Sequence, residues 1–178
     1  LLENSGEARE HLNDIKDEVK RKPFQWVAEK HGLSEDLTRK GINLLKSLTI
    51  KGPMVHFADY AATRHLSQEK FLVTTGFTAL QQSKIRKMGL EKDFKEIYIV
   101  DPETTTKTKK DIFQEILQKH QLLSSEVVVI GDDPDSEIKA AQELGIKAVL
   151  YRKEGPPQST SDLPAISDFG ELQNVLGN

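Results

Sequence analysis

The sequence predicts an α/β protein in which a doubly wound parallel sheet follows a small helical unit. From residue 70 onward, short apolar runs alternate with amphipathic stretches, which is the strand and helix order of parallel sheets. Residues 6–48 are instead highly charged and place their apolar side chains at helical spacing. A turn around Gly52 and Pro53 separates the two regions. The chain therefore divides into a helical N-terminal part and an α/β part.

The N-terminal part is expected to be a small helical bundle. Its apolar residues fall into groups at 12–19, 24–28 and 37–45, and Pro23 and Gly32 mark turns between them. Ser34 offers a side-chain oxygen that can cap the helix after it.

The α/β part is expected to alternate strands with helices. We expect strands at 71–73, 97–100, 127–130 and 148–151, and helices at 83–88, 111–120, 136–144 and 169–176. Residues 155–162 are expected to form a loop. Sheets of this kind bind their substrates at the carboxyl ends of the strands. The residues directly after each apolar run are therefore the candidates for function.

Composition excludes several classes of protein. The chain has 178 residues, of which 37% are hydrophobic and 30% charged, enough for one globular domain with a small insertion. A net charge of -3 gives no electrostatic reason to expect nucleic acid as a partner. Its apolar runs are too short to cross a membrane. The absence of cysteine excludes disulfides, zinc thiolate sites and a cysteine nucleophile, and fits a cytoplasmic protein.

The first strand end is a candidate phosphate site. Thr74, Thr75 and Gly76 follow the apolar run at 71–73, so hydroxyl and backbone N–H groups lie where the sheet turns toward its next helix. Such groups can bind a phosphate oxygen. The structural alternative is a threonine-rich strand end that caps the next helix.

The second and third strand ends carry charge. Three lysines lie at 107–110, just before an expected helix. Positive charge at the start of a helix opposes the helix dipole, so at least one of these lysines is expected to have another role. The alternative is that the run forms a solvated face, as such runs usually do. The third end holds four acidic side chains within six residues, Asp132, Asp133, Asp135 and Glu137. They repel one another unless a cation neutralises them, and hard oxygen ligands suit magnesium. Asp133 can serve as a helix cap with Pro134 after it, but capping does not explain Asp132.

Taken in order, these strand ends across residues 66–178 resemble the second, third and fourth motifs of haloacid dehalogenase-like hydrolases. Thr74 ends the apolar strand of the second motif. Lys107 stands six residues before Phe113, as in the third motif, with Lys109 and Lys110 as neighbouring alternatives. Gly131 and Asp132, with Glu137 five positions on, match the fourth motif.

The resemblance implies a Rossmann-like core with a small helical cap. It assigns residues 1–5 to the tail of the first core motif, 6–55 to the cap and 56–178 to the core. It implies phosphate monoester hydrolysis, with Thr74 and Lys107 as catalytic residues and Thr74, Thr75, Gly76 and Lys107 binding substrate. It also implies Mg²⁺ held by Asp132 and Glu137. The expected partner is a small phosphorylated metabolite, with neither nucleic acid nor membrane involved.

The first motif of that family, with its nucleophilic aspartate, has no good match. Asp59 and Thr63 have the right separation, but Ala61 replaces the second aspartate and too few residues precede the strand at 71 for a crossover. We therefore expect residues 57–66 to be helical and the nucleophile to lie upstream of residue 1. The sheet should then have an unpaired position beside the strand at 127–130, with Leu1 near Asp132.

Two other functions remain open. One is a non-catalytic relative that binds phosphate or metal, because these residues contain no nucleophile. The other is a receiver-like signalling domain with an acidic magnesium pocket, which leaves the helical N-terminal part unexplained. Dehalogenase or phosphonatase chemistry also fits this scaffold, but the acidic third strand end favours phosphate ester and magnesium. The substrate cannot be read from the sequence.

Overall fold

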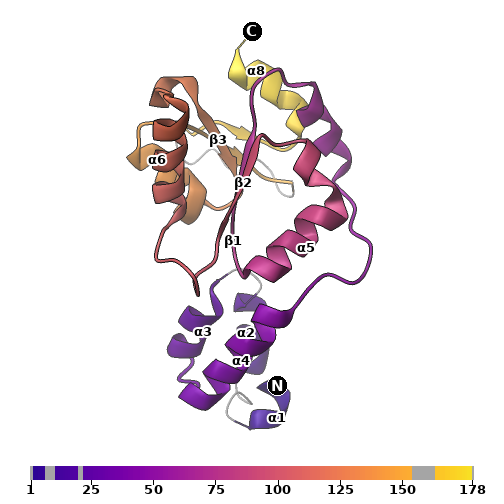
Figure 1. The fold of residues 1–178 in the computed structure, drawn as a ribbon, viewed down its shortest axis with the longest axis vertical. Helices are drawn as coiled ribbons and strands as arrows, with labels where there is room; N and C mark the ends of the chain where they lie inside the picture. Colours follow the sequence, from indigo (N-terminus) through magenta and orange to yellow (C-terminus); the bar gives the residue numbers. More distant parts are fainter. Residues whose placement is uncertain (1, 7–10, 20–21, 154–162, 178) are drawn as a thin grey trace.

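The computed structural model describes residues 2–6, 11–19, 22–153 and 163–177. In Figure 1 the N-terminal helices lie together below the strands, and the rest of the chain forms an α/β layer structure. The α/β prediction is thus confirmed. Within the described residues, no helix has both the length and the apolar character needed to cross a lipid bilayer.

The helical N-terminal part has its own small core. It consists of α1 (Leu2–Ser5), α2 (Leu12–Glu18), α3 (Phe24–Lys30) and α4 (Glu35–Ser47). Ser34 caps α4 as predicted, since its Oγ accepts the Leu37 N–H at 3.3 Å. Ile15 and Val27 are fully buried at the centre of this part. The division into core tail, cap and core by residue number stays a prediction.

The linker between the two parts includes a 3₁₀ helix, η1 (Ala58–His65), which agrees with the helical prediction for 57–66. Asp59 within it is buried. Its carboxylate accepts hydrogen bonds from the Tyr151 hydroxyl at 2.8 Å and the Phe169 N–H at 3.2 Å, and pairs with Lys153 at 3.0 Å. Asp59 therefore anchors the linker to the C-terminal part of the fold.

The described residues of the α/β part contain five parallel strands. They are β1 (Phe71–Thr75), β2 (Glu96–Val100), β3 (Val128–Gly131), β4 (Lys147–Tyr151) and β5 (Ala165–Ile166). The helical elements between and after them are α5 (Thr78–Met88), η2 (Leu90–Lys92), α6 (Lys109–His120), η3 (Ser124–Glu126), η4 (Pro134–Ile138), α7 (Lys139–Glu143), η5 (Phe169–Glu171) and α8 (Leu172–Leu176). In Figure 1, α5 and α6 flank the β1 and β2 pair on opposite sides, as a doubly wound fold requires.

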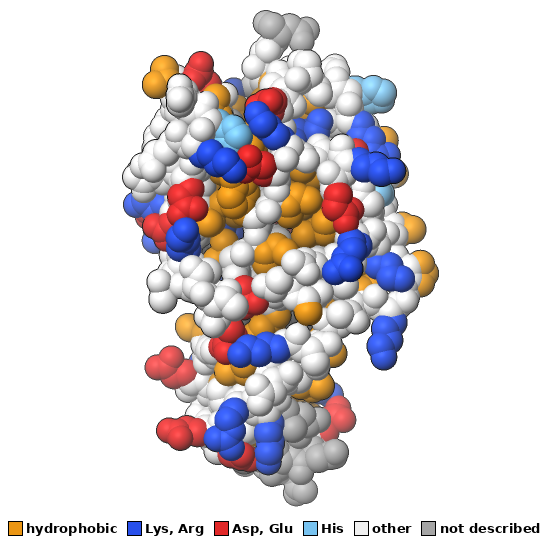
Figure 2. Space-filling view, in the orientation of Figure 1, with side chains coloured by type: hydrophobic (Ala, Val, Ile, Leu, Met, Phe, Trp, Pro, Cys, Tyr) orange, Lys and Arg blue, Asp and Glu red, His pale blue; other side chains and the backbone are white. Residues whose placement is uncertain are grey.

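The strands are hydrogen-bonded as two separate sheets. One has the order β1-β2 and the other β3-β4-β5. Among the described residues, β1 and β3 therefore each have one unpaired edge, and the edge of β3 is the one that the sequence predicted. Side chains of residues 71–74 stay partly exposed, and hydrophobic side chains show at the centre of the molecular face in Figure 2. Leu1 lies outside the described residues.

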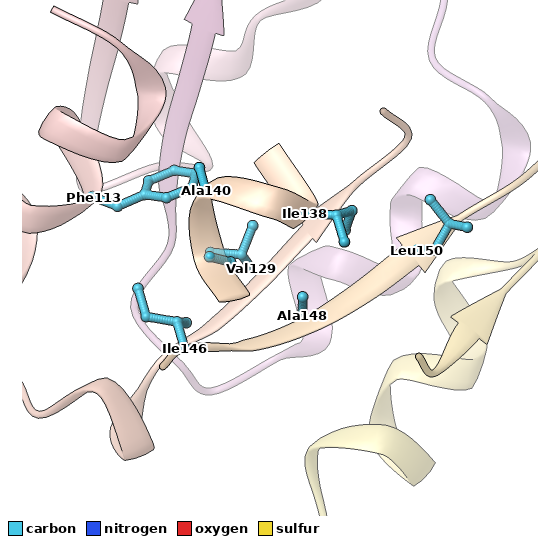
Figure 3. Packing of buried hydrophobic residues seen from close by; sticks show 8 residues of the cluster. Phe113, Val129, Ile138, Ala140, Ile146, Ala148 and Leu150 are labelled. Atoms are coloured by element: carbon cyan, nitrogen blue, oxygen red, sulfur yellow. The ribbon is translucent and has the colours of Figure 1, made fainter. Parts of the chain in front are cut away.

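A shared core joins the two sheets. Buried side chains from α6, β3, η4, α7 and β4 form one cluster, shown in Figure 3, and Val73 of β1 packs against it. The labelled members are Phe113, Val129, Ile138, Ala140, Ile146, Ala148 and Leu150. A second cluster buries Val149, Ile166 and Leu172. The first cluster places the carboxyl end of β3 close to α6.

Four predicted helices differ in the structure. The helix expected at 83–88 begins at Thr78, five residues earlier, and the helix expected at 111–120 begins at Lys109, two residues earlier. The helix expected at 136–144 begins two residues earlier and opens with a π-helical turn, η4, before α7. The helix expected at 169–176 is divided into η5 and α8. The short strand β5 was not predicted, because two residues carry too little periodicity to distinguish a strand. The four predicted strands, β1 to β4, are present, and their ends differ from the predicted ends by one or two residues.

We expect Leu172→Ala to destabilise the protein by about 2–5 kcal/mol, because Leu172 is only 1% exposed and its truncation leaves a cavity against Val149 and Ile166. Urea unfolding measures this free energy. Leu123→Ala is the control, since Leu123 is 67% exposed and its loss should change stability by less than about 0.5 kcal/mol. Equal effects at the two positions would contradict the packing described for α8.

Candidate active site

The acidic residues after β3 are organised by a tight turn. Asp133 caps η4 as predicted, since its Oδ1 accepts the Asp135 N–H at 2.9 Å and Pro134 occupies the first turn. The Ile138 N–H donates to the Asp133 carbonyl at 3.4 Å, which is the five-residue spacing of a π turn. Such turns are frequent at functional sites. Asp132 precedes the cap and is exposed at the strand tip.

Glu137 holds the strand tip in place. It is only 7% exposed, and its Oε1 accepts the backbone N–H groups of Asp132 at 3.1 Å and Asp133 at 3.2 Å. Glycine at 131 makes this possible, because a Cβ there would lie 1.9 Å from Glu137 Cγ. Glu137 thus orients Asp132 through its backbone.

Lys109 neutralises the buried carboxylate. Its Nζ lies 2.5 Å from Glu137 Oε2, and the two side chains are 18% and 10% exposed. Burial raises the pKa of Glu137, but the hydrogen bond and charge of Lys109 outweigh burial and hold that pKa below its usual range. Partial desolvation of its carboxyl group and the neighbouring Glu137 raise the pKa of Asp132 instead, although the residue as a whole is exposed. One fully ionised carboxylate, a cation and an adjacent carboxyl therefore share this strand end.

The structure separates Lys107 from this acidic pair. Lys107 Nζ lies 2.6 Å from Glu115 on the exposed face of α6. Lys109 instead stands at the first residue of α6, after the Thr108 cap, and reaches Glu137. The motif spacing indicates Lys107, whereas the lysine that contacts the acidic end of β3 is Lys109, two residues later; the role of Lys107 stays a prediction. Sequence spacing could not distinguish them, because the direction of each side chain depends on where the helix begins.

The phosphate-site candidates lie at the carboxyl end of β1. Thr74 Oγ1 is 3.4 Å from Gln81 Oε1, and Gln81 Nε2 donates to the Thr75 carbonyl at 3.1 Å. Gly76 has φ = +142°, a conformation that favours glycine, and a Cβ there would lie 2.5 Å from Gln81 Nε2. The glycine therefore allows the chain to turn from β1 toward α5.

Asp101 is a strand-end residue whose role the sequence did not indicate. It follows β2 and is only 5% exposed. Its Oδ2 accepts the Thr78 N–H at 2.8 Å and hydroxyl at 2.7 Å, and its Oδ1 accepts the Glu103 N–H at 3.0 Å. Asp101 thus joins the start of α5 to the loop after β2. The sequence feature that could have indicated this role is the position of Asp101 directly after an apolar strand, which it shares with Asp132.

One contact places these strand ends on the same edge of the fold. Since β1 and β2 are parallel, Thr74 and the loop after β2 lie at the same edge. The Lys109 contact with Glu137 brings the end of β3 beside the start of α6, which follows that loop. Thr74, Asp101, Lys109 and Asp132 therefore belong to one edge.

The donor set at this edge fits magnesium in part. The exposed Asp132 carboxylate is the kind of hard oxygen ligand that magnesium prefers. Both Glu137 oxygens already have protein partners, which supports a positioning role for Glu137 more than direct contact with a metal. Within the described ranges, no group of three or more His, Cys, Asp or Glu side chains is arranged to hold a metal ion.

We expect Gly131→Ala to displace Glu137 and destabilise the protein by roughly 1–3 kcal/mol, because the added Cβ overlaps Glu137 Cγ. Gly52→Ala is the matched control, since a Cβ at Gly52 meets nothing within 4 Å. Chemical unfolding and the amide NMR shifts of Asp132 and Asp133 measure the effect. If both variants unfold like the parent protein, the packing of Glu137 against Gly131 is wrong.

Comparison with known proteins identifies the family. The sequence profile of the haloacid dehalogenase-like hydrolases matches residues 61–151, about half of the chain. The HAD-hydrolase YfnB of Bacillus subtilis (strain 168) is 26% identical over 109 residues, which cover 60% of this chain and 46% of that protein. A glyceraldehyde 3-phosphate phosphatase of Pyrococcus furiosus is 28% identical over 114 residues, covering 58% and 48%. The chain spans about half the length of these curated relatives.

Solved structures share the fold. A haloacid dehalogenase-like family protein from Streptococcus pneumoniae, SP0104, matches with a TM-score of 0.65 at 20% identity, over 88% of this chain and 78% of that one. YfnB bound to magnesium matches with a TM-score of 0.59 at 22% identity, over 87% and 70%. A 2-haloacid dehalogenase from Pseudomonas syringae matches with a TM-score of 0.54 at 21% identity, over 84% and 66%. The profile match, on the strands that carry the candidate site, shows that this chain belongs to the haloacid dehalogenase-like hydrolases.

Proposed function

We propose that this hydrolase is a magnesium-dependent phosphatase that cleaves a small phosphate monoester. The observation that carries the proposal is the exposed Asp132 carboxylate at the tip of β3, held in place by the buried Glu137 and Lys109 pair. Asp132 would hold the magnesium ion, and Glu137 would fix its backbone. Bound magnesium would screen the negative charge of the substrate phosphate.

Substrate binding is assigned to the other strand ends. The Thr74 hydroxyl and the backbone around Thr75 and Gly76 would bind the oxygens of the transferring phosphoryl group. Lys109 would supply positive charge beside them, or Lys107 if substrate turns its side chain away from Glu115. These groups bind and orient the phosphate where charge develops during transfer.

The nucleophile in this proposal is an aspartate in a strand upstream of residue 1. Its carboxylate oxygen would attack phosphorus and form an aspartyl-phosphate as the P–O bond to the alcohol breaks. A second aspartate two residues on would protonate the leaving alcohol and then activate water for hydrolysis. The unpaired edges of β1 and β3 support this proposal, because a strand between them would pair both.

The helical N-terminal part would act as a cap that covers the site and helps to select a small phosphorylated metabolite. Its helices lie beyond the carboxyl end of β1 in Figure 1, where the substrate is expected. Closure of such a part excludes water from the reaction. The substrate itself is to be found by screening phosphorylated metabolites with the complete protein.

Two alternatives to the phosphatase are a dehalogenase and a non-catalytic binding protein. Dehalogenase chemistry is represented among the solved structures with this fold, but the acidic end of β3 favours a metal-assisted phosphate reaction. A non-catalytic relative that binds phosphate or metal would lack the upstream nucleophile. The sequence of the natural gene product before residue 1 distinguishes this reading, since an Asp-x-Asp pair there supports the enzyme.

We expect Asp132→Asn to abolish most magnesium-dependent phosphatase activity of the complete protein while the fold stays intact. Replacing outer partners of metal ligands typically changes affinity or activity roughly 10–100-fold, and loss of a direct ligand should exceed this. Phosphate release with and without EDTA measures activity, and calorimetry measures magnesium affinity. Asp135→Asn is the control, since Asp135 is exposed within the turn. Full activity and unchanged magnesium affinity in Asp132→Asn would show that Asp132 is not a magnesium ligand.

We also expect Lys109→Met to reduce phosphatase activity more than Lys107→Met. Lys109 neutralises the buried Glu137, whereas Lys107 pairs with a partly exposed glutamate, an interaction of about 0–1 kcal/mol. Activity should be measured well below each variant's unfolding midpoint, so that stability does not decide the result. The opposite order would assign the motif lysine to Lys107, as its spacing to Phe113 suggests.

A further inference from the structure

Glu103 bridges the helical N-terminal part and the sheet. It lies three residues after β2, and its side chain is 22% exposed. Its Oε1 accepts a hydrogen bond from Gln25 Nε2 of α3 at 2.6 Å, and its Oε2 lies 2.7 Å from Lys46 Nζ of α4. One carboxylate on the sheet side thus contacts two different helices of the N-terminal part.

The sheet side holds Glu103 in a fixed position. Its backbone N–H donates to Asp101 Oδ1 at 3.0 Å, while Asp101 Oδ2 accepts both the N–H and the hydroxyl of Thr78 at the start of α5. A continuous chain of hydrogen bonds therefore leads from the first turn of α5, directly after the Thr74 to Gly76 segment, to the two helices.

Glu103 acts at a different place from the linker. The start of the linker is attached to α5, because the Ile50 N–H donates a hydrogen bond to Ser83 Oγ at 2.8 Å. Glu103 instead contacts α3 and α4 from the loop after β2, beside a groove of about 500 Å³ whose other lining residues all belong to the helical N-terminal part. The hydrogen bonds from Lys46 and Gln25 lower the pKa of Glu103, so its carboxylate is ionised at neutral pH.

We propose that Glu103 is a positioning residue that holds the helical N-terminal part over the carboxyl edge of the sheet through Gln25 and Lys46. Removing its charge would weaken the contacts with both helices and leave the linker attachment in place. The inference goes beyond the proposed function, because it concerns the placement of the helices and holds for any chemistry at the strand ends.

A distance measurement tests the proposal without using activity. Residues 1–178 contain no cysteine, so Lys40→Cys on α4 and Gln114→Cys on α6 allow two spin labels to be attached to exposed positions. Any cysteine elsewhere in the complete protein is replaced by serine. Pulsed electron spin resonance then gives the distance distribution between α4 and α6.

The Glu103→Gln variant should broaden this distribution and add a population at longer distance, and Lys46→Met should reproduce the effect. Glu143→Gln is the matched control. It removes a comparable exposed pair, Lys110 with Glu143 at 2.8 Å, that lies within the α/β part, and should leave the distribution unchanged.

Unfolding followed by circular dichroism verifies that every variant is folded. If Glu103→Gln alters folding, the Lys46→Met variant decides the test, because the Lys46 side chain is 46% exposed and its replacement should not disturb folding. Distributions identical to the parent in both variants would overturn the proposal, as would an equal change in Glu143→Gln. Because the readout is a distance, loss of the proposed phosphatase function would be seen separately and would not decide the result.

Discussion

The buried carboxylate of Glu137 is the interaction on which the candidate site depends. A carboxylate removed from water is costly unless hydrogen bonds and an opposite charge compensate for it. The backbone N–H groups of Asp132 and Asp133 at the tip of β3 and the side chain of Lys109 on α6 provide that compensation. The arrangement links the tip of β3, the π turn after it and the start of α6. It explains why position 131 has no side chain and why Asp132 remains exposed.

Asp101 plays a similar organising part after β2. Like Glu137, it is buried, and its oxygens accept hydrogen bonds from groups that begin the following segments. Burial raises the pKa of Asp101, but these hydrogen bonds lower it overall. Two strand ends thus use a buried carboxylate to fix the chain that leaves the sheet. Glu103 extends the second of these arrangements to the helical N-terminal part, which connects the placement of α3 and α4 to the edge where substrate is expected.

The division of the strands into two sheets is the other constraint on the fold. The edges of β1 and β3 leave backbone groups without strand partners in the part of the chain that the structure describes, and Val73 still packs against the core of the second sheet. Unpaired backbone groups at a strand edge favour pairing with another strand, and one strand between β1 and β3 would pair both edges. This observation supports the proposed upstream strand.

The sequence by itself determined the strand and helix order, the strand-end positions and the caps at Ser34 and Asp133. These features follow from periodicity and local hydrogen bonding, which act over a few residues. The partner of Lys109, the role of Asp101 and the contacts of Glu103 could not be read in this way. They depend on groups 23 to 78 residues apart, such as Thr78 with Asp101 and Gln25 with Glu103. Only the tertiary structure decided them, because a side chain's partner across such a separation is set by how the elements pack.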